Sequence, residues 1–373
     1  MKEICIICDT EIANDPRVMR QINALSGDNR LTVVGRGELN LPQVTMLSWD
    51  ACYRNAANRL EWAWYLLCHM THAFTVLEKR FSVAHEPLLL RRFDLVIVNE
   101  VISLPLGFLI SQGAPVYCDL HEYYFDMQPG DIRSRLTVGY YKYLCNTYLS
   151  RCAAVSTVCD GLARIYESIA RQAVLVIHNV PSAQDLRTIP PDERRIRLIH
   201  HGYADPRRHI EGMIEMMDYV DARFTLDLML TTKSAYRDFL QAEAAKRPNI
   251  AWKEPVPMPE ICRTINVYDL GLYLLPPHTV NTKFSLPNKF FEFIQARLGI
   301  AIGPSHEMAV LVRQHDLGIV ADDFVPQSMA KRLNVLTVDD IARFKGNADK
   351  IAPYFSSEEA GKTIRDTVNK LLH

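Results

Sequence analysis

The sequence predicts an α/β protein with parallel sheets, divided into two domains. Short apolar runs alternate with helical patterns along all 373 residues, as in sheets whose parallel strands are joined by helices. A chain of this length exceeds one comfortable core, and a polar passage with a Pro-Pro pair at 182–195 separates two series of runs. We therefore expect an N-terminal domain over 1–181, a C-terminal domain over 182–354, and a final helix over 355–373 that packs back on the N-terminal domain.

The N-terminal domain is expected to contain six strands, one for each apolar run before the polar passage. These runs are 4–8, 31–34, 95–98, 116–118, 153–156 and 175–177. A helix is expected between the first two runs, because Asp15 is a good N-cap and Pro16 suits the first helical turn. Val18, Ile22 and Leu25 recur at helical spacing, so their face should be buried.

The C-terminal domain repeats the pattern, with strands expected at 196–199, 225–230, 270–275 and 300–302. A helix should begin near Ser285, with Pro287 in its first turn, where the missing N–H of proline would have no partner anyway. Its buried stripe consists of residues at i, i+3, i+4 and i+7. They are Phe290, Phe293, Ile294 and, with its stem at the edge of the stripe, Arg297.

Two charged residues of this helix, Lys289 and Glu292, are expected on a different flank. The free N–H groups and the dipole of a helix N-terminus attract an anion, and a carboxylate one turn along can accept two hydrogen bonds from a vicinal diol. This combination fits the diphosphate and the ribose of a nucleotide. The alternative is that Lys289 and Glu292 form an exposed i, i+3 pair, which contributes a few tenths of a kcal/mol to an ordinary amphipathic helix.

Composition excludes several classes of protein. The 42 lysines and arginines balance 43 aspartates and glutamates, which leaves no overall basic field for nucleic acid. Nine scattered cysteines indicate reduced thiols in the cytoplasm, and Cys5 and Cys8 lie in an apolar run that indicates buried strand residues and not a metal site. Neither a signal peptide nor a membrane span of roughly 18 apolar residues is expected.

Several motifs, taken together, resemble the retaining glycosyltransferases of family 4, which have the GT-B fold. The most specific is the run Leu-Pro-Asn-Lys-x-x-Glu at 286–292, followed by Gly299 and an apolar strand. The others are Asp-Pro-Arg-Val at 15–18, Asp-Leu-His-Glu at 119–122, Val-Ser at 155–156, His-Asn at 178–179, a glycine turn leading to basic residues at 201–208, and Asp-Leu-Gly at 269–271. Each motif alone is weak, but their order and spacing make the set specific.

The resemblance implies two Rossmann-like domains facing across a cleft, the first for an acceptor and the second for a nucleotide-diphosphate sugar. It implies metal-independent transfer of a hexose-type sugar with retained anomeric configuration, and UDP is the expected carrier. The acceptor would be a glycan or a lipid-linked molecule in surface polysaccharide or glycoconjugate synthesis. No cofactor is expected beyond the sugar nucleotide itself.

The resemblance also implies roles for individual residues. His121, Arg208 and Lys289 are the expected catalytic residues, since fixed cations stabilise a departing diphosphate. The expected donor-binding residues are Gly202, Arg207, Ser285, Leu286, Pro287, Asn288 and Glu292. The expected acceptor-side residues are Asp15, Arg17, Glu122 and Tyr123, and no metal ligands are expected. The alternatives are that the basic residues are solvated on helix surfaces, and that His121 is a structural histidine bonded to Asp119 or to the backbone.

The sequence departs from the family pattern at two places. Phe284 stands where the family often has a second glutamate, and the loop 10–14 after the first strand has no glycine. Close backbone approach of a ligand to that loop is therefore not expected. These departures motivate a rival interpretation, a binding protein of the same shape without turnover. A second rival is a sugar-nucleotide epimerase, which the Leu-Pro-Asn-Lys-x-x-Glu run disfavours.

A long amphipathic segment at 60–81 bears on the acceptor. Trp62 and Tyr65 widen its apolar face, and basic residues such as Arg59 and Lys79 flank it. Aromatic and basic residues together suit a membrane interface, which would place the protein at the inner face of the membrane beside a lipid-linked acceptor. Burial of both faces in the first domain is the alternative, and the pattern favours it.

Overall fold

The computed structural model describes residues 1–48, 64, 67–68, 87–125 and 132–373, with 132–136 as backbone only. The chain forms two compact units. Unit 1 comprises Met1–Asn179, Thr279–Asn281 and Ala360–His373, and unit 2 comprises Val180–His278 and Thr282–Glu359. Apart from Trp64, Leu67 and Cys68, the segment 60–81 lies outside the described residues, so its expected role stays a prediction.

Unit 1 is built on a seven-stranded parallel sheet with the order β3-β2-β1-β4-β5-β6-β7. The strands are β1 Glu3–Glu11, β2 Arg30–Arg36, β3 Val44–Ser48, β4 Leu95–Asn99, β5 Val116–Leu120, β6 Ala154–Thr157 and β7 Leu175–Val176. All six predicted runs are confirmed as strands. The sequence does not predict the edge strand β3, because its residues are only partly buried and form no continuous apolar run.

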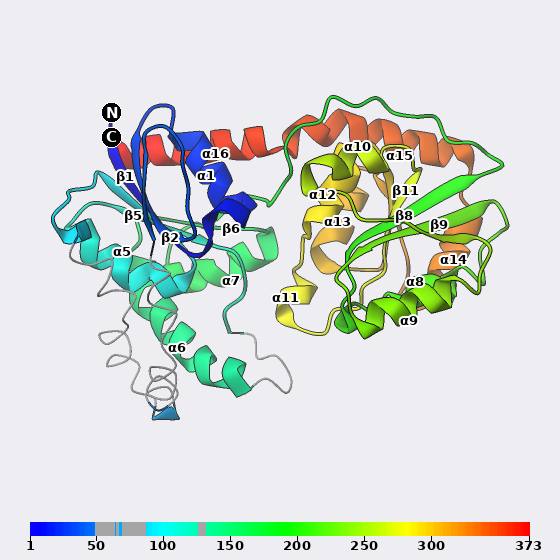
Figure 1. Cartoon of the computed structure of the whole chain (residues 1–373), viewed down its shortest axis with the longest axis horizontal. Helices are drawn as coiled ribbons and strands as arrows, with labels where there is room; N and C mark the ends of the chain where they lie inside the picture. The colour runs from blue at the N-terminus through cyan, green and yellow to red at the C-terminus, as the bar shows by residue number, and fades with distance from the viewer. Residues whose placement is uncertain (49–63, 65–66, 69–86, 126–131) are drawn as a thin grey trace. The chain divides into compact units, whose positions relative to one another are not determined.

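Helices cover both faces of this sheet (Figure 1). They are α1 Pro16–Leu25, α5 Leu104–Ser111, α6 Ile132–Tyr148, α7 Asp160–Ala170 and most of α16 Ser357–Leu372, with 3-10 helices η1 Ile12–Asn14, η3 Val101–Ser103 and η4 Leu149–Arg151. The predicted N-cap is confirmed, since the Asp15 carboxylate accepts hydrogen bonds from the N–H groups of Arg17 and Val18. The predicted apolar face of α1 is buried and packs in one core with Ile364 and Val368 of α16.

Unit 2 has a six-stranded parallel sheet with the order β10-β9-β8-β11-β12-β13. The strands are β8 Ile196–Tyr203, β9 Phe224–Thr231, β10 Ile250–Trp252, β11 Leu270–Tyr273, β12 Gly299–Ile302 and β13 Gly318–Val320. The four predicted strands are confirmed. The sequence does not predict β10 and β13, because these edge strands have three residues each and are too short to form an apolar run.

The helices of unit 2 also lie on both faces of its sheet (Figure 1). They are α8 Glu211–Met216, α9 Ala235–Ala244, α10 Ile261–Ile265, α12 Asn288–Gln295, α13 His306–Gln314, α14 Pro326–Asn334 and α15 Val338–Ile351, with 3-10 helices η5 Pro206–Arg208, η6 Met258–Glu260 and η7 Ala352–Tyr354. The short α11 Val280–Lys283 precedes α12. Met213 of α8, Leu240 of α9 and Leu333 of α14 share one core with the strands.

Helix α12 begins at Asn288, later than its predicted start near Ser285. Pro287 is the N-cap, with an extended backbone at ψ 150°, and is not part of the first turn. The physical reason is that a proline disfavours the helical conformation of the residue before it, so the helix cannot include Leu286. Lys289 and Glu292 are buried along with the apolar stripe, at 5% and 6% exposure, so the alternative of an exposed surface pair is wrong.

In both sheets, the order in which the chain adds strands reverses direction beside the first strand of the unit. In unit 1 this point lies between β1 and β4, and in unit 2 it lies between β8 and β11. Open parallel sheets bind ligands outside the carboxyl ends of the strands at such a point. The carboxyl ends of these strands therefore locate the candidate sites.

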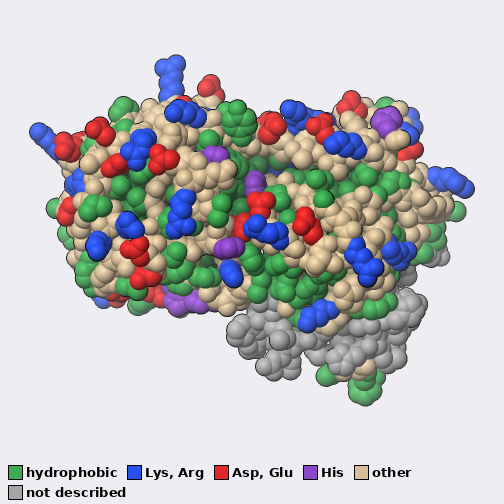
Figure 2. All heavy atoms as spheres, turned by 180° about the vertical axis from the view of Figure 1, so that it is seen from behind, with side chains coloured by type: hydrophobic (Ala, Val, Ile, Leu, Met, Phe, Trp, Pro, Cys, Tyr) green, Lys and Arg blue, Asp and Glu red, His purple; other side chains and the backbone are tan. Residues whose placement is uncertain are grey.

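Surface and cysteine features agree with the composition. On the face drawn in Figure 2, Lys and Arg side chains are interspersed with Asp and Glu, as a formal net charge of −1 suggests. Cys5 and Cys8 are both buried in β1, as predicted. In the part of the chain that the structure describes, no cluster of three or more His, Cys, Asp or Glu side chains could hold a metal ion. No helix of that part combines the length and apolarity needed to cross a membrane.

Candidate functional site

In unit 2, the carboxyl end of β8, the 3-10 helix η5 after it and the start of α12 bring Gly202, Arg208 and Lys289 together. Gly202 has a φ of +123°, a backbone conformation that residues with side chains rarely adopt. A Cβ atom here would lie 2.9 Å from Lys289 Nζ and 3.8 Å from a terminal nitrogen of Arg208. Glycine is therefore favoured mainly by the backbone conformation, and a side chain here would also displace the Lys289 ammonium.

Lys289 is buried without a hydrogen-bond partner for its ammonium. Only 5% of its surface is exposed, and its Nζ has no hydrogen-bond partner among the described residues. Nζ lies 5.1 Å from the centroid of the Tyr273 ring at the end of β11. Burial, reinforced by the positive charge of Arg208, lowers the pKa of Lys289 to about 7. An unpaired buried ammonium is costly, and such an arrangement is typical of a site that receives an anion.

Glu292 lies one turn further along α12 and is also buried. Its carboxylate is 3.5 Å from Nε2 of His201. Burial lowers the pKa of His201 to about 3, so this histidine is neutral near pH 7. Burial raises the pKa of Glu292 to about 7, against the opposing effect of Lys289. The first two turns of α12 thus offer a cation and then a carboxylate that can accept hydrogen bonds.

Arg207 and Arg208 have different surroundings. Arg207 is exposed, and its guanidinium binds the Asp205 carboxylate, with Nη2 2.7 Å from Oδ2. Arg208 is half-buried, lies beside Gly202 and contributes to the lowered pKa of Lys289. Of the two arginines, Arg208 is therefore the one whose charge acts together with Lys289.

A hollow of about 530 Å³ opens beside Arg208. Its walls come from the carboxyl ends of β8 and β9 and from the start of α9, and they include Tyr203, Asp205, Thr232, Ser234 and Tyr236. Ser234 caps α9 by accepting a hydrogen bond from the Arg237 N–H. The volume falls within the range of roughly 300–1,000 Å³ that is usual for small-molecule pockets.

The residues just before Lys289 form the turn into α12. The Ser285 N–H donates to the Thr282 carbonyl at 3.4 Å, Leu286 is buried, and the side chain of Pro287 cannot cap the helix. Asn288 is the first helical residue. The side chain of the N-cap residue does not bind the first N–H groups of α12, and of these the Phe290 N–H donates to the Pro287 carbonyl at 2.9 Å. The start of the helix therefore offers N–H groups before Phe290 to an anion or to water.

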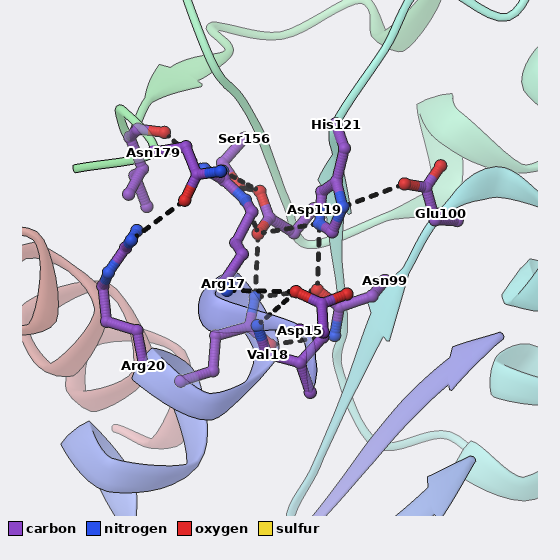
Figure 3. Close-up of polar contacts among 12 residues, drawn as sticks. Asp15, Arg17, Val18, Arg20, Asn99, Glu100, Asp119, His121, Ser156 and Asn179 are labelled. Carbon is purple, nitrogen blue, oxygen red and sulfur yellow. Dashed lines mark hydrogen bonds and ion pairs between the residues drawn. The ribbon is translucent and has the colours of Figure 1, made fainter. Parts of the chain in front are cut away.

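In unit 1, a buried polar network lies at the carboxyl ends of β4 and β5 (Figure 3). Its centre is Asp119, which is 1% exposed. Arg17 of α1 donates to both carboxylate oxygens, from Nε at 2.7 Å and from Nη2 at 2.6 Å, and its Nη1 donates to the Ile177 carbonyl. Gln21 and Ser156 donate to the same carboxylate. All three guanidinium nitrogens of Arg17 are thus used inside unit 1.

His121 follows β5 and has a side chain that is 16% exposed. Its Nδ1 lies 2.9 Å from Glu100 Oε1, while its Nε2 lies 3.3 Å from Asn99 Oδ1 and 3.6 Å from Asp119 Oδ2. Burial opposes a charge on the ring, but Glu100 and Asp119 together raise the pKa of His121 to about 10. His121 is therefore positively charged at neutral pH. Its contact with Asp119, which the alternative of a structural histidine requires, is present but is only one of its interactions.

The other three expected acceptor-side residues lie near the same edge of the sheet but outside the centre of this network. Asp15 caps α1 and accepts a hydrogen bond from the Thr10 hydroxyl at 2.8 Å. Glu122 is exposed, and Tyr123 is half-buried with its ring packed edge-on against Phe125 at 5.1 Å. Their proposed contact with an acceptor stays a prediction.

Sequence reasoning missed Asn99, Glu100, Gln21 and Tyr273. A signal existed for the first two, because they directly follow the predicted strand 95–98, where polar residues at a carboxyl strand end suggest a site. Gln21 lies on a predicted helix, but its position in the sequence does not reveal that it is buried. Tyr273 lies inside the predicted strand 270–275, where an apolar run gives no sign of a functional residue.

No protein-family model and no curated protein matches the chain, but solved structures match it over its whole length. HepE from Anabaena in complex with UDP has a TM-score of 0.70 at 14% identity, covering 99% of this chain and 100% of that chain. The UDP-forming alpha,alpha-trehalose-phosphate synthase from Burkholderia vietnamiensis has a TM-score of 0.65 at 12% identity, covering 100% of this chain and 99% of that chain.

These likenesses show the fold. The chain has the GT-B fold with two Rossmann-like domains, as the sequence predicts. The resemblance to GT-B glycosyltransferases is thereby confirmed at the level of structure. Membership of family 4 in particular stays a prediction, because identities of 12–14% carry no more than the fold.

Proposed function

We propose that the chain is a glycosyltransferase that moves a sugar from a nucleotide-diphosphate sugar to a hydroxyl group of an acceptor. The observation that carries the proposal is the buried ammonium of Lys289, which has no hydrogen-bond partner among the described residues and lies beside Arg208. This pair suits a diphosphate, and Glu292 one turn along suits the ribose diol. A uridine base is proposed because the similar Anabaena and Burkholderia proteins are described as UDP-bound and UDP-forming.

In the proposed step, the bond between the anomeric carbon and the diphosphate oxygen breaks, and the acceptor oxygen bonds to that carbon. Negative charge grows on the departing diphosphate, where Arg208 and Lys289 stabilise it. The acceptor proton passes to a diphosphate oxygen, so no protein base is needed. Retention of configuration, independence of metal ions and a hexose-type sugar belong to the proposal. So does a glycan or lipid-linked acceptor in polysaccharide or glycoconjugate synthesis, reached from the cytoplasm at the inner face of the membrane.

Thermal unfolding with a ligand panel tests this proposal. UDP-glucose and UDP should raise the melting temperature, because a ligand that binds only the folded state stabilises it by about 2.7 kcal/mol at a hundred times its Kd. Glucose alone should leave it unchanged. If no nucleotide or nucleotide sugar in a panel of uridine, guanosine and adenosine compounds shifts the transition, the proposal is wrong. Binding without transfer or slow hydrolysis would favour the rival binding protein, and a changed sugar configuration without an acceptor would favour the epimerase.

Glu292→Gln should weaken the binding of the cognate nucleotide sugar about 10- to 150-fold. The amide keeps one acceptor oxygen but loses the charge-assisted bonds to the diol, which are worth roughly 1.5–3 kcal/mol. Isothermal titration calorimetry measures the change. The matching 2′-deoxyribose donor is the control, since it lacks one of the two hydroxyls and should show a smaller difference between the parent and the variant. Equal affinity of both proteins for the ribose donor would remove Glu292 from the site.

Donor affinity should pass through a maximum near neutral pH. Below about pH 7, Glu292 takes up a proton and loses its charge, and above about pH 7 Lys289 loses its proton, as their pKa values of about 7 require. The diphosphate of a nucleotide sugar has no group that titrates near neutrality, so both limbs report the protein. Lys289→Arg should remove the alkaline limb, because an arginine keeps its charge. A flat profile in calorimetry between about pH 5.5 and about pH 8.5 would contradict this prediction.

A further inference from the structure

The partners of Nδ1 of His121 require that this nitrogen carry a proton. Nδ1 lies 2.9 Å from Glu100 Oε1. A dashed line marks this contact in Figure 3. An ionised carboxylate only accepts hydrogen bonds. The second carboxylate oxygen of Glu100 accepts a hydrogen bond from the Tyr124 hydroxyl. Glu100 therefore holds its carboxylate between two donors, of which His121 is one.

The partners of Nε2 lead to the same conclusion. Nε2 lies 3.3 Å from Asn99 Oδ1 and 3.6 Å from Asp119 Oδ2. The orientation of the Asn99 amide is set on its other side, because Nδ2 donates to the Ile7 carbonyl and to Gln21 Oε1, at 3.4 and 2.8 Å. Its oxygen therefore faces the histidine. Both atoms in front of Nε2 are acceptors, so Nε2 also carries a proton.

The backbone of Glu100 is a second, independent observation. Its φ of 70° and ψ of 145° lie in a region that is almost reserved for glycine. A residue with a side chain is strained there, and such strain persists only where the surroundings impose it. The backbone N–H of Glu100 donates to the Asp119 carbonyl at 3.0 Å and its carbonyl accepts from the Ser103 N–H at 3.2 Å, while its carboxylate contacts His121 and Tyr124. The strained backbone and the contacts of the carboxylate together indicate that Glu100 positions the His121 ring.

We propose that Glu100 is a positioning residue that keeps both ring nitrogens of His121 protonated and turned toward the protein. His121 then presents a fixed positive charge and ring C–H groups to a ligand of unit 1, and no lone pair that could accept a proton. The nature of that ligand rests on the proposed function. Within it, His121 is excluded as the base that deprotonates the acceptor hydroxyl, and its charge is what remains for catalysis.

The groups that face His121 belong to three elements. Glu100 follows β4, and Asp119 lies in β5. Arg17 of α1 binds Asp119 from the other side, so Asp119 is already neutralised by an ion pair. Tyr124 donates to Glu100 and does not contact the ring nitrogens. Because Asp119 is already paired with Arg17, Glu100 is the carboxylate on which the charge of His121 mainly depends.

Histidine NMR on the full-length protein without ligand tests this proposal. The ring signal of His121, assigned among the 12 histidines by its absence in His121→Gln, should keep the imidazolium shift between about pH 5.5 and about pH 8.5. In Glu100→Gln, which keeps the size of the side chain, the same signal should titrate within this range. Glu38→Gln is the control, because it removes one negative charge from an exposed position of unit 1 and should leave His121 unchanged.

A neutral His121 in the parent protein near pH 7 overturns the proposal. A His121 that stays charged throughout in Glu100→Gln also overturns it, because Asp119 alone would then suffice. If Glu100→Gln does not fold, the titration of the parent together with that of Tyr124→Phe decides, since loss of the hydroxyl should leave His121 protonated. These measurements need no donor or acceptor, so a failed nucleotide panel would refute the proposed function and leave the result for Glu100 standing.

Discussion

Replacing Lys289 by methionine should lower the turnover number about 100- to 1,000-fold, the loss that is typical when one preorganised donor to a developing anion is removed. The loss should exceed the change in donor affinity, because the charge on the diphosphate is greatest in the transition state. Transfer rates at saturating donor, with acceptors found by screening, measure the first quantity, and calorimetry measures the second. Arg208→Ala should also lower the turnover number by more than it lowers donor affinity.

The stability of the same variant provides the internal check. Lys289 is an unpaired ammonium that is 5% exposed, and methionine fills a similar volume without a desolvation penalty. The melting temperature should therefore stay the same or rise while turnover falls. Lys331→Met, at an exposed position of α14, should change neither. A variant at Lys289 that transfers sugar at the parent rate would remove this residue from the chemistry, whatever its stability.

The sequence predicts the central strands because they are apolar throughout and therefore leave a continuous run. It misses β3, β10 and β13, which lie away from the centre of each sheet and are short or only partly buried. The predicted start of α12 is wrong by a few residues, because a proline at the N-cap and a proline in the first turn look alike in a sequence. The restriction that proline places on Leu286 would have decided between them.

The residue types of the unit 2 site could be predicted, but not their burial. Helical spacing places Lys289 and Glu292 away from the stripe of Phe290 and Phe293, and an isolated helix would expose them. They are buried because β8 and β11 pack beside α12, where Gly271 leaves room for the Phe293 ring and Gly202 leaves room for the lysine. Those contacts join residues far apart in the chain, which no local pattern reveals.

The unit 1 network shows the same limit. Asp119 and Arg17 are named by the sequence, but as parts of two separate motifs. Only the parallel pairing of β1, β4 and β5 places α1 above the end of β5 and turns the two motifs into one ion pair. The consequence is a change of role, since Arg17 is expected to meet an acceptor and is instead engaged with Asp119 and Ile177 inside the unit.

Arg17→Met should destabilise unit 1 by about 3–5 kcal/mol, the usual cost of removing one partner of a buried ion pair. The side chains of Arg17 and Asp119 are 3% and 2% exposed, so the variant leaves a buried carboxylate without its main counter-charge. Thermal or urea unfolding measures the loss. Arg332→Met is the matched control, because it is the same substitution in an ion pair whose side chains are 48% and 68% exposed, and it should have little effect.

The destabilisation should also depend on pH in one direction. Burial by itself would raise the pKa of Asp119, but Arg17 and His121 hold it well below its usual value in the folded protein. A carboxylate with a lowered pKa contributes stability above its unfolded pKa of about 4, and this contribution is lost as the pH falls through the folded value. The difference in unfolding free energy between the parent and Arg17→Met should therefore be largest near neutrality and shrink toward acid pH. A difference that is the same at pH 7 and at about pH 4, or one no larger than that of Arg332→Met, would mean that the Arg17–Asp119 pair does not hold unit 1 together.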